Sequence, residues 1–229
     1  QAQAISDFPQ RADYHRVFSQ INLAVANSLS QGVQPRASPS AQVQQDIVSL
    51  LQQSINSARN AVILSPLNSV HWQNLAQIYR ALINVGQNAE QFALSSMNQA
   101  IALDPFNPQL YIQFGGIYYQ LGNFDAAQNQ FQVAINLKRD FANAYYNLGN
   151  ALEQKGDFTN ALAAYRTVKQ LSQGNQTNLD IINEKIEALE AKIGKTTING
   201  QQVQAGSDQT PLEISTPSAN LPPQTLRKY

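Results

Sequence analysis

The chain has 229 residues, and its 15 Lys and Arg residues balance 15 Asp and Glu residues, so the formal net charge is zero. A neutral chain lacks the positive field that attracts phosphate backbones, so we expect no nucleic-acid partner. No apolar run approaches the roughly 18 residues of a membrane span, and the absence of cysteine excludes thiolate catalysis and cysteine-bound zinc.

The N-terminal part consists of a short lead, residues 1–10, and a helix pair within residues 11–68. The first helix is expected from Arg11 to Leu29, because apolar residues recur on one face at helical spacing. These residues are Tyr14, Val17, Phe18, Ile21, Ala24 and Val25. The second helix is expected from Val43 to Leu64, and residues 30–41 between the helices are rich in Ser, Gly and Pro, which is typical of a loop.

Residues 108–141 and 142–175 repeat one another with a period of 34 residues. Tyr111, Gly115, Gly122, Ala127 and Phe131 are followed 34 positions later by Tyr145, Gly149, Gly156, Ala161 and Tyr165. The pattern extends back over residues 69–107, from Trp72 to Pro105, with five additional residues inserted between its helices. The insertion either lengthens both helices or widens the turn between them.

The C-terminal part begins with a helix expected at residues 177–194, with Thr177 and Asn178 as N-cap candidates and Gly194 as its stop. Its apolar residues recur every three or four positions, which is typical of a helix that covers the end of a repeat array. Residues 195–229 form a tail rich in Ser, Thr, Pro and Gln, in which residues 196–203 favour a short hairpin around an Asn-Gly turn.

The 34-residue pattern resembles the tetratricopeptide repeat, a helix–turn–helix unit. The aromatic residues Tyr111 and Tyr145, the small residues Gly115 and Gly149, and the turn glycines Gly122 and Gly156 carry the resemblance. It implies an all-α solenoid of about four helix pairs with a C-terminal capping helix and an irregular or short-β tail. The first pair, residues 11–68, is the most divergent.

The same resemblance implies that a partner's peptide lies in a concave groove lined by the first helix of each repeat. By position, that groove is expected to hold Gln73, Asn74, Gln77, Arg80, Gln109, Ile112, Gln113, Tyr119, Asn143, Tyr146, Asn147, Asn150 and Gln154. Side-chain amides donate and accept hydrogen bonds at once, which suits the backbone of an extended peptide. The alternative is that these residues are the solvated inner face of a chain in which 53 residues are Gln or Asn. Basic residues other than Arg80 are scarce in this set, which argues against a clamp for a terminal carboxylate.

Catalytic patterns are missing from the sequence, so we expect neither enzymatic activity nor a cofactor or metal site. His15 and His71 are the only histidines and stand 56 positions apart, which favours packing roles. The sequon at Asn175, and Thr210, Ser215, Thr216 and Ser218 in the tail, are possible glycosylation positions.

A looser resemblance links residues 7–14 and 100–122 to extracytoplasmic repeat regions of bacteria, some of them attached to O-antigen-ligase-like membrane proteins. It implies a location outside the bacterial membrane, after removal of a segment that preceded Gln1. Two functions remain open. The first is a structural protein that self-associates head to tail as the subunit of an extracellular filament, with its tail reaching the next copy. The second is an adaptor whose groove binds another protein's peptide.

Overall fold

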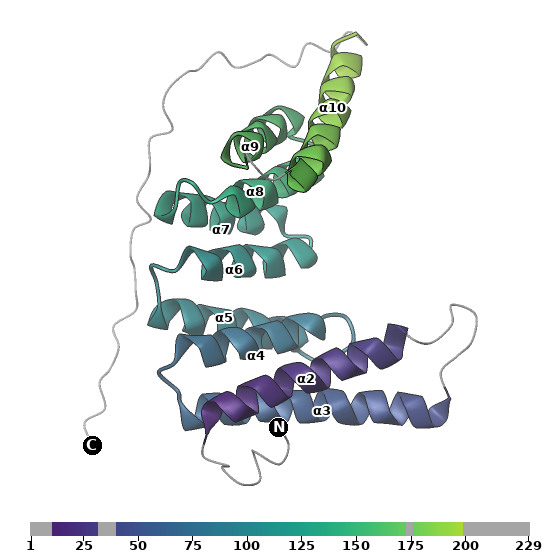
Figure 1. Cartoon of the computed structure of the whole chain (residues 1–229), viewed down its shortest axis with the longest axis vertical. Coiled ribbons are helices and arrows are strands. Elements are labelled where there is room, and N and C mark those ends of the chain that lie inside the picture. The colour runs from purple at the N-terminus through teal and green to yellow at the C-terminus, as the bar shows by residue number, and fades with distance from the viewer. Residues whose placement is uncertain (1–10, 32–39, 173–175, 199–229) are drawn as a thin grey trace.

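The computed structural model describes residues 11–31, 40–172 and 176–198, and for residues 176–178 and 195–198 it describes the backbone alone. Within these ranges the regular structure is entirely helical, so the predicted all-α class is confirmed. The helices, labelled as in Figure 1, are α2 (Ala12–Gln31), α3 (Ala41–Leu64), α4 (Ser69–Ala81), α5 (Ala89–Leu103), α6 (Pro108–Gln120), α7 (Phe124–Leu137), α8 (Ala142–Gln154), α9 (Phe158–Leu171) and α10 (Gln176–Ile198).

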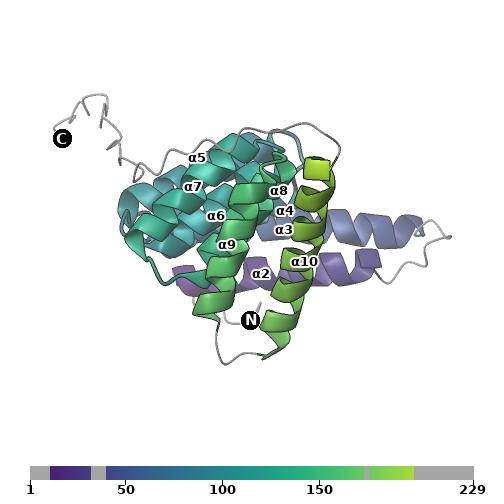
Figure 2. The same ribbon diagram turned by 90° about the horizontal axis from the view of Figure 1, so that it is seen from above.

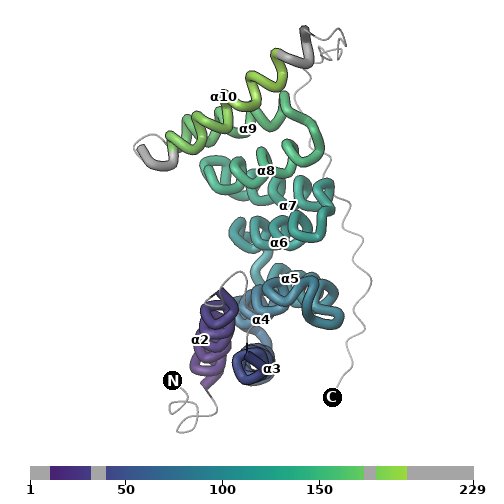
Figure 3. The backbone as a smooth tube through the Cα atoms, turned by 90° about the vertical axis from the view of Figure 1, so that its right-hand side faces the viewer, coloured from purple at the N-terminus to yellow at the C-terminus, as the bar shows by residue number. Residues whose placement is uncertain are grey.

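Four helical hairpins, α2–α3, α4–α5, α6–α7 and α8–α9, stack in chain order to form the predicted solenoid (Figures 1 and 3). The last helix, α10, lies across the end of the stack beside α9. At the other end, α2 and α3 have 20 and 24 residues and extend past the 13-residue helix α4 (Figure 2). The hydrophobic core runs through the stack as a chain of small clusters because each repeat contacts only its neighbours.

Glycine in α6 and α8 lets the two helices of a hairpin approach closely. A Cβ placed on Gly115 would lie 2.7 Å from Cδ1 of Phe131, and one on Gly149 would lie 2.7 Å from Cε1 of Tyr165. Both aromatic rings are fully buried. The turn glycines Gly122 and Gly156 have φ values of 74° and 79°, in the left-handed region that favours glycine. The roles that the repeat pattern assigns to these glycines therefore match their geometry.

In two of the turns between repeats, those before α4 and α6, an aromatic residue is hydrogen-bonded to the turn. The indole Nε1 of Trp72 donates to the carbonyl oxygen of Pro66 over 2.7 Å, and the hydroxyl of Tyr111 donates to that of Pro105 over 2.9 Å. These bonds hold the aromatic side chain at the start of α4 and of α6. They explain why the sequence pattern keeps an aromatic residue six positions after the proline.

The five additional residues of the second repeat widen its turn. Helix α4 ends at Ala81 and α5 begins at Ala89, so neither helix is much longer than its counterparts in the next repeat. The intervening chain contains Asn84 and Asn88 with φ values of 75° and 56°. Asparagine tolerates this left-handed conformation better than most residues, which lets the longer turn close.

The first hairpin packs differently from the prediction. The residues of α2 that are buried are Ala12, His15, Ser19, Asn22 and Ala26, whereas the predicted apolar face remains half-buried or exposed, with Ile21 and Val25 41% and 43% accessible. The reason is that hydrogen bonds hold the Ser19 face of α2 against its neighbours. Ser54 of α3 donates to the carbonyl oxygen of Ser19, and Asn74 of α4 donates to the Ser19 hydroxyl. The helix also continues to Gln31, so Ser30 and Gln31 belong to it and not to the predicted loop.

The last helix is longer than predicted. It begins at Gln176, so Thr177 and Asn178 lie inside it, and it continues through Gly194 to Ile198. The predicted hairpin is therefore wrong at residues 196–198, which are helical. The rest of the hairpin and the tail lie outside the described residues. So do four of the possible glycosylation positions, Thr210, Ser215, Thr216 and Ser218, as well as Asn175.

Candidate protein-interaction groove

Two hollows contain predicted groove residues, and we call them the amide hollow and the cap hollow. The amide hollow has a volume of about 440 Å³ and lies between α2, α4 and α6. Its lining combines the apolar side chains of Leu23, Ala24, Val70 and Ile78 with the amides of Gln20, Asn27, Gln73, Asn74, Gln77 and Gln113. The predicted groove residues Gln73, Asn74, Gln77 and Gln113 are thus brought together.

Amide hydrogen bonds connect the repeats across the amide hollow. The Nε2 atoms of Gln73 and Gln77 in α4 both donate to Oε1 of Gln113 in α6, over 2.9 and 3.1 Å. These bonds occupy the oxygen of Gln113, while its NH₂ group retains two donors for other partners. The three side chains are half-buried, so they form a polar surface that is held in place and still reachable from solvent.

Two further predicted residues are occupied by structural contacts. Asn74 is 5% exposed; its Nδ2 donates to the Ser19 hydroxyl, and its Oδ1 accepts from Nε2 of Gln20 over 2.9 Å. Nε of Arg80 donates to Oε1 of Gln120 over 3.1 Å, and the backbone oxygen of Arg80 accepts from the Gln120 amide. Both residues tie neighbouring hairpins together, which leaves less of either side chain for a ligand.

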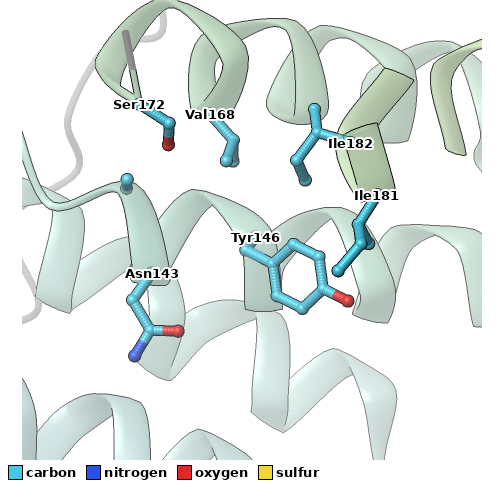
Figure 4. A pocket seen from close by; sticks show the side chains of 7 residues that line it. Asn143, Tyr146, Val168, Ser172, Ile181 and Ile182 are labelled. Atoms are coloured by element: carbon cyan, nitrogen blue, oxygen red, sulfur yellow. The ribbon is translucent and has the colours of Figure 1, made fainter. Parts of the chain in front are cut away.

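The cap hollow has a volume of about 500 Å³ and lies where α8, α9 and α10 meet. Its lining residues are Ala142, Asn143, Tyr146, Val168, Ser172, Ile181 and Ile182. Figure 4 shows the Tyr146 ring and the Asn143 amide, both from α8, below side chains contributed by α9 and α10. Ile181 is 50% exposed, so the hollow offers an apolar wall opposite an amide.

The remaining predicted residues do not form one continuous surface. Ile112 is only 6% exposed and packs among Ala134, Ile135 and Ala144, so the prediction that it lines the groove is wrong. The reason is that its side chain fills the joint between successive repeats. The others lie as follows: Gln109 and Tyr119 are half-buried in α6, Asn147 donates to Asn143, Asn150 accepts from Tyr165, and Gln154 is exposed at the end of α8.

Residues from the first and last helices were missed by the sequence reasoning. Gln20, Leu23, Ala24 and Asn27 of α2 line the amide hollow, and Ile181 and Ile182 of α10 line the cap hollow. Of the α2 residues, only Ala24 belongs to the apolar pattern predicted for that helix, and the pattern indicated a packing face and not a groove lining. The spacing of apolar residues in α10 indicated its packing stripe, but not that Ile181 beside that stripe would remain exposed.

A polar cluster joins α10 to the last repeat. Nζ of Lys185 lies 3.0 Å from Oδ1 of Asn150, 3.4 Å from Oε2 of Glu153 and 3.2 Å from the hydroxyl of Tyr165. Burial raises the pKa of Tyr165, and the Glu153 carboxylate raises it further. Burial would also raise the pKa of Glu153, but the charge of Lys185, hydrogen bonds from Tyr165 and Lys185, and the charge of Lys192 hold it below its ordinary value. The cluster therefore favours an ionised Glu153.

This pKa shift predicts that acid weakens the attachment of α10. A carboxyl group with a lowered pKa in the folded state stabilises that state above its ordinary pKa and loses the contribution as the pH falls through the folded value. We expect the urea midpoint of the wild-type chain to fall more between pH 6 and pH 3 than that of Glu153→Gln, whose single amide oxygen can still accept from Tyr165 and Lys185 but which cannot titrate. Equal losses in the two proteins would contradict the assignment.

The described residues contain no group of three or more His, Asp or Glu side chains arranged to hold a metal ion. No described helix is long and apolar enough to cross a bilayer. Both histidines are buried, His15 in α2 and His71 in α4. Burial lowers the pKa of His71, with opposing effects from Asp13 and Arg16. A buried, neutral His71 is consistent with the packing role expected from the sequence.

Comparisons with known proteins agree with this geometry. A TPR repeat model matches residues 115–156, and a tetratricopeptide repeat model matches residues 142–175. A thermophilic TPR protein of Thermus thermophilus has a TM-score of 0.59 at 17% identity, with 81% of this chain and 86% of that chain covered. PilF of Pseudomonas aeruginosa has a TM-score of 0.56 at 16% identity, covering 81% and 72% of the two chains. At these identities the likeness shows the fold alone.

Curated relatives match over shorter stretches. A probable UDP-N-acetylglucosamine–peptide N-acetylglucosaminyltransferase of Arabidopsis thaliana is 30% identical over 122 residues, 50% of this chain and 12% of its own length. The BBSome complex member BBS4 of Bos taurus is 29% identical over 125 residues, 55% of this chain and 23% of its own length. The chain thus spans less than a quarter of either relative. Residues 115–175 match tetratricopeptide repeat models, and the described chain folds as a solenoid of the tetratricopeptide type.

Proposed function

We propose that this protein is a non-enzymatic scaffold whose amide hollow binds an extended, uncharged peptide segment of a partner protein. Tetratricopeptide repeats are protein-interaction modules, and the observation that carries the proposal is the row of amides from Gln73 and Gln77 to Gln113. These side chains are held by one another across two repeats, so a peptide would meet donors and acceptors that need little further ordering.

The chemistry of the hollow favours a neutral ligand. Its lining amides are uncharged, and Leu23, Val70 and Ile78 supply an apolar floor for alternate side chains of an extended strand. Arg80, the basic residue expected in the groove, is bonded to Gln120 instead. A peptide rich in Ser, Thr, Asn or Gln with small apolar residues between them fits this surface better than an acidic one does.

The test is a binding screen of short uncharged peptides against the full chain, followed by substitution of Gln113. Gln113→Ala removes a side chain that bridges α4 and α6, so we expect the affinity to fall about tenfold, which corresponds to about 1.4 kcal/mol. Gln99→Ala, at an exposed position of α5, is the matched control and should leave the affinity unchanged. The proposal would be contradicted if Gln113→Ala bound the peptide with the same affinity as the wild-type chain, or if acidic peptides bound preferentially.

A second candidate function is self-association, which extends to an extracellular filament in a bacterial setting. The observation that favours it is an apolar stripe on α2, in which Tyr14 and Phe18 are half-buried and Ile21 and Val25 are exposed, at spacings of four, three and four residues. Ile21 and Val25 are more than 40% exposed although they lie in the middle of a long helix. When a second copy covers an exposed apolar stripe, apolar surface is removed from water, and this burial favours association.

Light scattering on the full chain tests this candidate. If copies associate through α2, replacing both Ile21 and Val25 with Lys should convert the oligomer to a monomer, because two desolvated charges oppose burial. Replacing Gln45, exposed on α3, with Lys is the control for added charge alone. A wild-type chain that remains monomeric at high concentration would rule out this interface and leave peptide binding as the proposed function.

A further inference from the structure

A second groove lies on a different face of the solenoid, between the second helices of the first two repeats. We call it the aromatic groove; it has a volume of about 720 Å³. Its lining residues come from α3, α4 and α5: Asn56, Arg59, Asn60, Val62, Ile63, Trp72, Leu75, Tyr79, Phe92, Ser95 and Ser96. It shares no lining residue with the amide hollow or the cap hollow.

Three aromatic rings give this groove its chemical character. Tyr79 and Phe92 are stacked, with ring centroids 5.0 Å apart and an angle of 28° between the planes. Trp72 is fixed by its hydrogen bond to Pro66. Phe92 is 39% exposed, and Ile63 on the opposite wall is 72% exposed. Tyr79 is only 7% exposed and supports the Phe92 ring, so Trp72 and Phe92 supply the accessible aromatic surfaces. Flat, fixed aromatic surfaces of this kind are suited to binding proline rings.

The rim of the groove is polar. Asn56, Asn60 and Ser95 are exposed on the two flanking helices and can hydrogen-bond to peptide carbonyl groups. Arg59 adds a cationic donor. An aromatic floor with scattered donors is the arrangement that binds peptides in the polyproline II conformation, whose backbone carbonyl groups are not bonded internally.

The chain itself contains a segment with the matching chemistry. Residues 217–226, Pro-Ser-Ala-Asn-Leu-Pro-Pro-Gln-Thr-Leu, include Pro217, Pro222 and Pro223 and have no charged side chain. Because proline fixes φ near −65°, a peptide of this sequence favours the extended conformation before it binds and loses little entropy on binding. Leu221 and Leu226 add two apolar side chains for the floor of the groove.

The same chain can reach the groove. Eighteen residues, 199–216, separate the end of α10 from Pro217, and fully extended they span about 60 Å. Along the stack, α10 and the α4–α5 hairpin are three layers apart (Figure 1), which corresponds to about 30 Å at 10 Å per layer. A tether of this length holds the segment near the groove at an effective concentration of about 1 mM, so a weak contact suffices.

We propose that the aromatic groove binds residues 217–226 of the same chain. The segment then acts as a strap that covers Trp72, Phe92 and Ile63 and holds the C-terminal tail along the solenoid. This inference does not depend on the proposed function, because it uses a different face and different residues.

Trp72 provides a direct readout because it is the only tryptophan in the sequence. We would measure acrylamide quenching of its fluorescence in the full chain and in a variant carrying Leu221→Ser, Pro222→Gly and Pro223→Gly. Covering one face of the indole roughly halves its accessible area, so quenching should rise about twofold in the variant. The control carries Pro211→Gly and Leu212→Ser, two tail changes outside the strap, and should be quenched like the wild type.

Addition of a synthetic 217–226 peptide to the triple variant should restore protection, and Phe92→Ala in the same background should weaken that peptide about tenfold. Equal quenching of wild type and triple variant would overturn the proposal. So would a peptide without effect at about millimolar concentration. Protection that grows with protein concentration, together with dimers in light scattering, would overturn the same-chain arrangement in favour of a tail supplied by a second copy.

Discussion

Replacing Gly115 with Ala should destabilise the protein by about 1–3 kcal/mol, as expected for overpacking of a filled core. The new Cβ would lie 2.7 Å from Cδ1 and 2.9 Å from Cζ of Phe131, a ring that is fully buried among its neighbours. Gly149→Ala should have a similar effect because the Cβ would meet Tyr165 at 2.7 Å. Urea unfolding followed by circular dichroism measures both changes.

Two further variants make this prediction sharper. Gly194→Ala is the matched control: it lies inside α10 with nothing within 4 Å of the new Cβ, so it should stabilise the helix by up to about 1 kcal/mol. The second repeat supplies the compensating pair, since Ala76 and Met97 occupy the positions that Gly115 and Phe131 occupy in the third, and both are fully buried. Phe131→Met should therefore recover part of the stability lost in Gly115→Ala. If the double variant lost the sum of the stabilities lost in Gly115→Ala and Phe131→Met, the steric explanation would be contradicted.

Replacing Leu189 with Ala should detach α10, at a cost of about 2–4 kcal/mol in the stability of the C-terminal end. Leu189 is 1% exposed and packs with Ile182 and Ile186 against the buried side chains of α8 and α9. Because α10 contacts only the end of the stack, its amides should lose protection from hydrogen exchange before those of α6 and α7 do. Hydrogen exchange resolved by mass spectrometry distinguishes the two regions.

Ile181→Ala is the control for this experiment because it truncates a side chain of the same size on the same helix. Ile181 is 50% exposed, so its truncation should cost less than about 1 kcal/mol. If both substitutions had equal effects, or if Leu189→Ala reduced protection evenly throughout the stack, α10 would not be the separate, terminal unit that the contacts indicate.

These predictions differ in how far they could be made without a structure. The small residue at Gly115 and the positive φ at Gly122 follow from the repeat pattern, because each is required inside a single hairpin. The contacts of one hairpin lie within some 34 residues of sequence, so the periodicity records them directly. The repeat pattern does not say which side chain the absence of a Cβ on Gly115 makes room for. The structure shows that it is the Phe131 ring.

The residues that line the amide hollow were predicted in part. Gln73, Gln77 and Gln113 fall together because positions on the first helix of each repeat project to the same face. Ile112 was misassigned because adjacent residues lie about 100° apart around a helix, so Gln113 reaches the open face while Ile112 enters the joint between repeats. Only the packing of α6 against α8 decides which of the two is buried. The apolar side chain of Ile112 is the signal that could have identified it as a core residue.

The sequence by itself determined the all-α fold class and the positions of the repeated turns. It also determined the small and aromatic residues that pack between the two helices of a hairpin. Only the tertiary structure decided the orientation of the two ends. In α2 the apolar stripe predicted the wrong buried face, because Ser19 is bonded to Ser54 and Asn74, and in α10 a single glycine did not end the helix. A glycine inside a helix costs only about 1 kcal/mol, which packing of the preceding turns offsets. The ends of a repeat array lack one neighbour, so periodicity cannot specify what the structure there must bury.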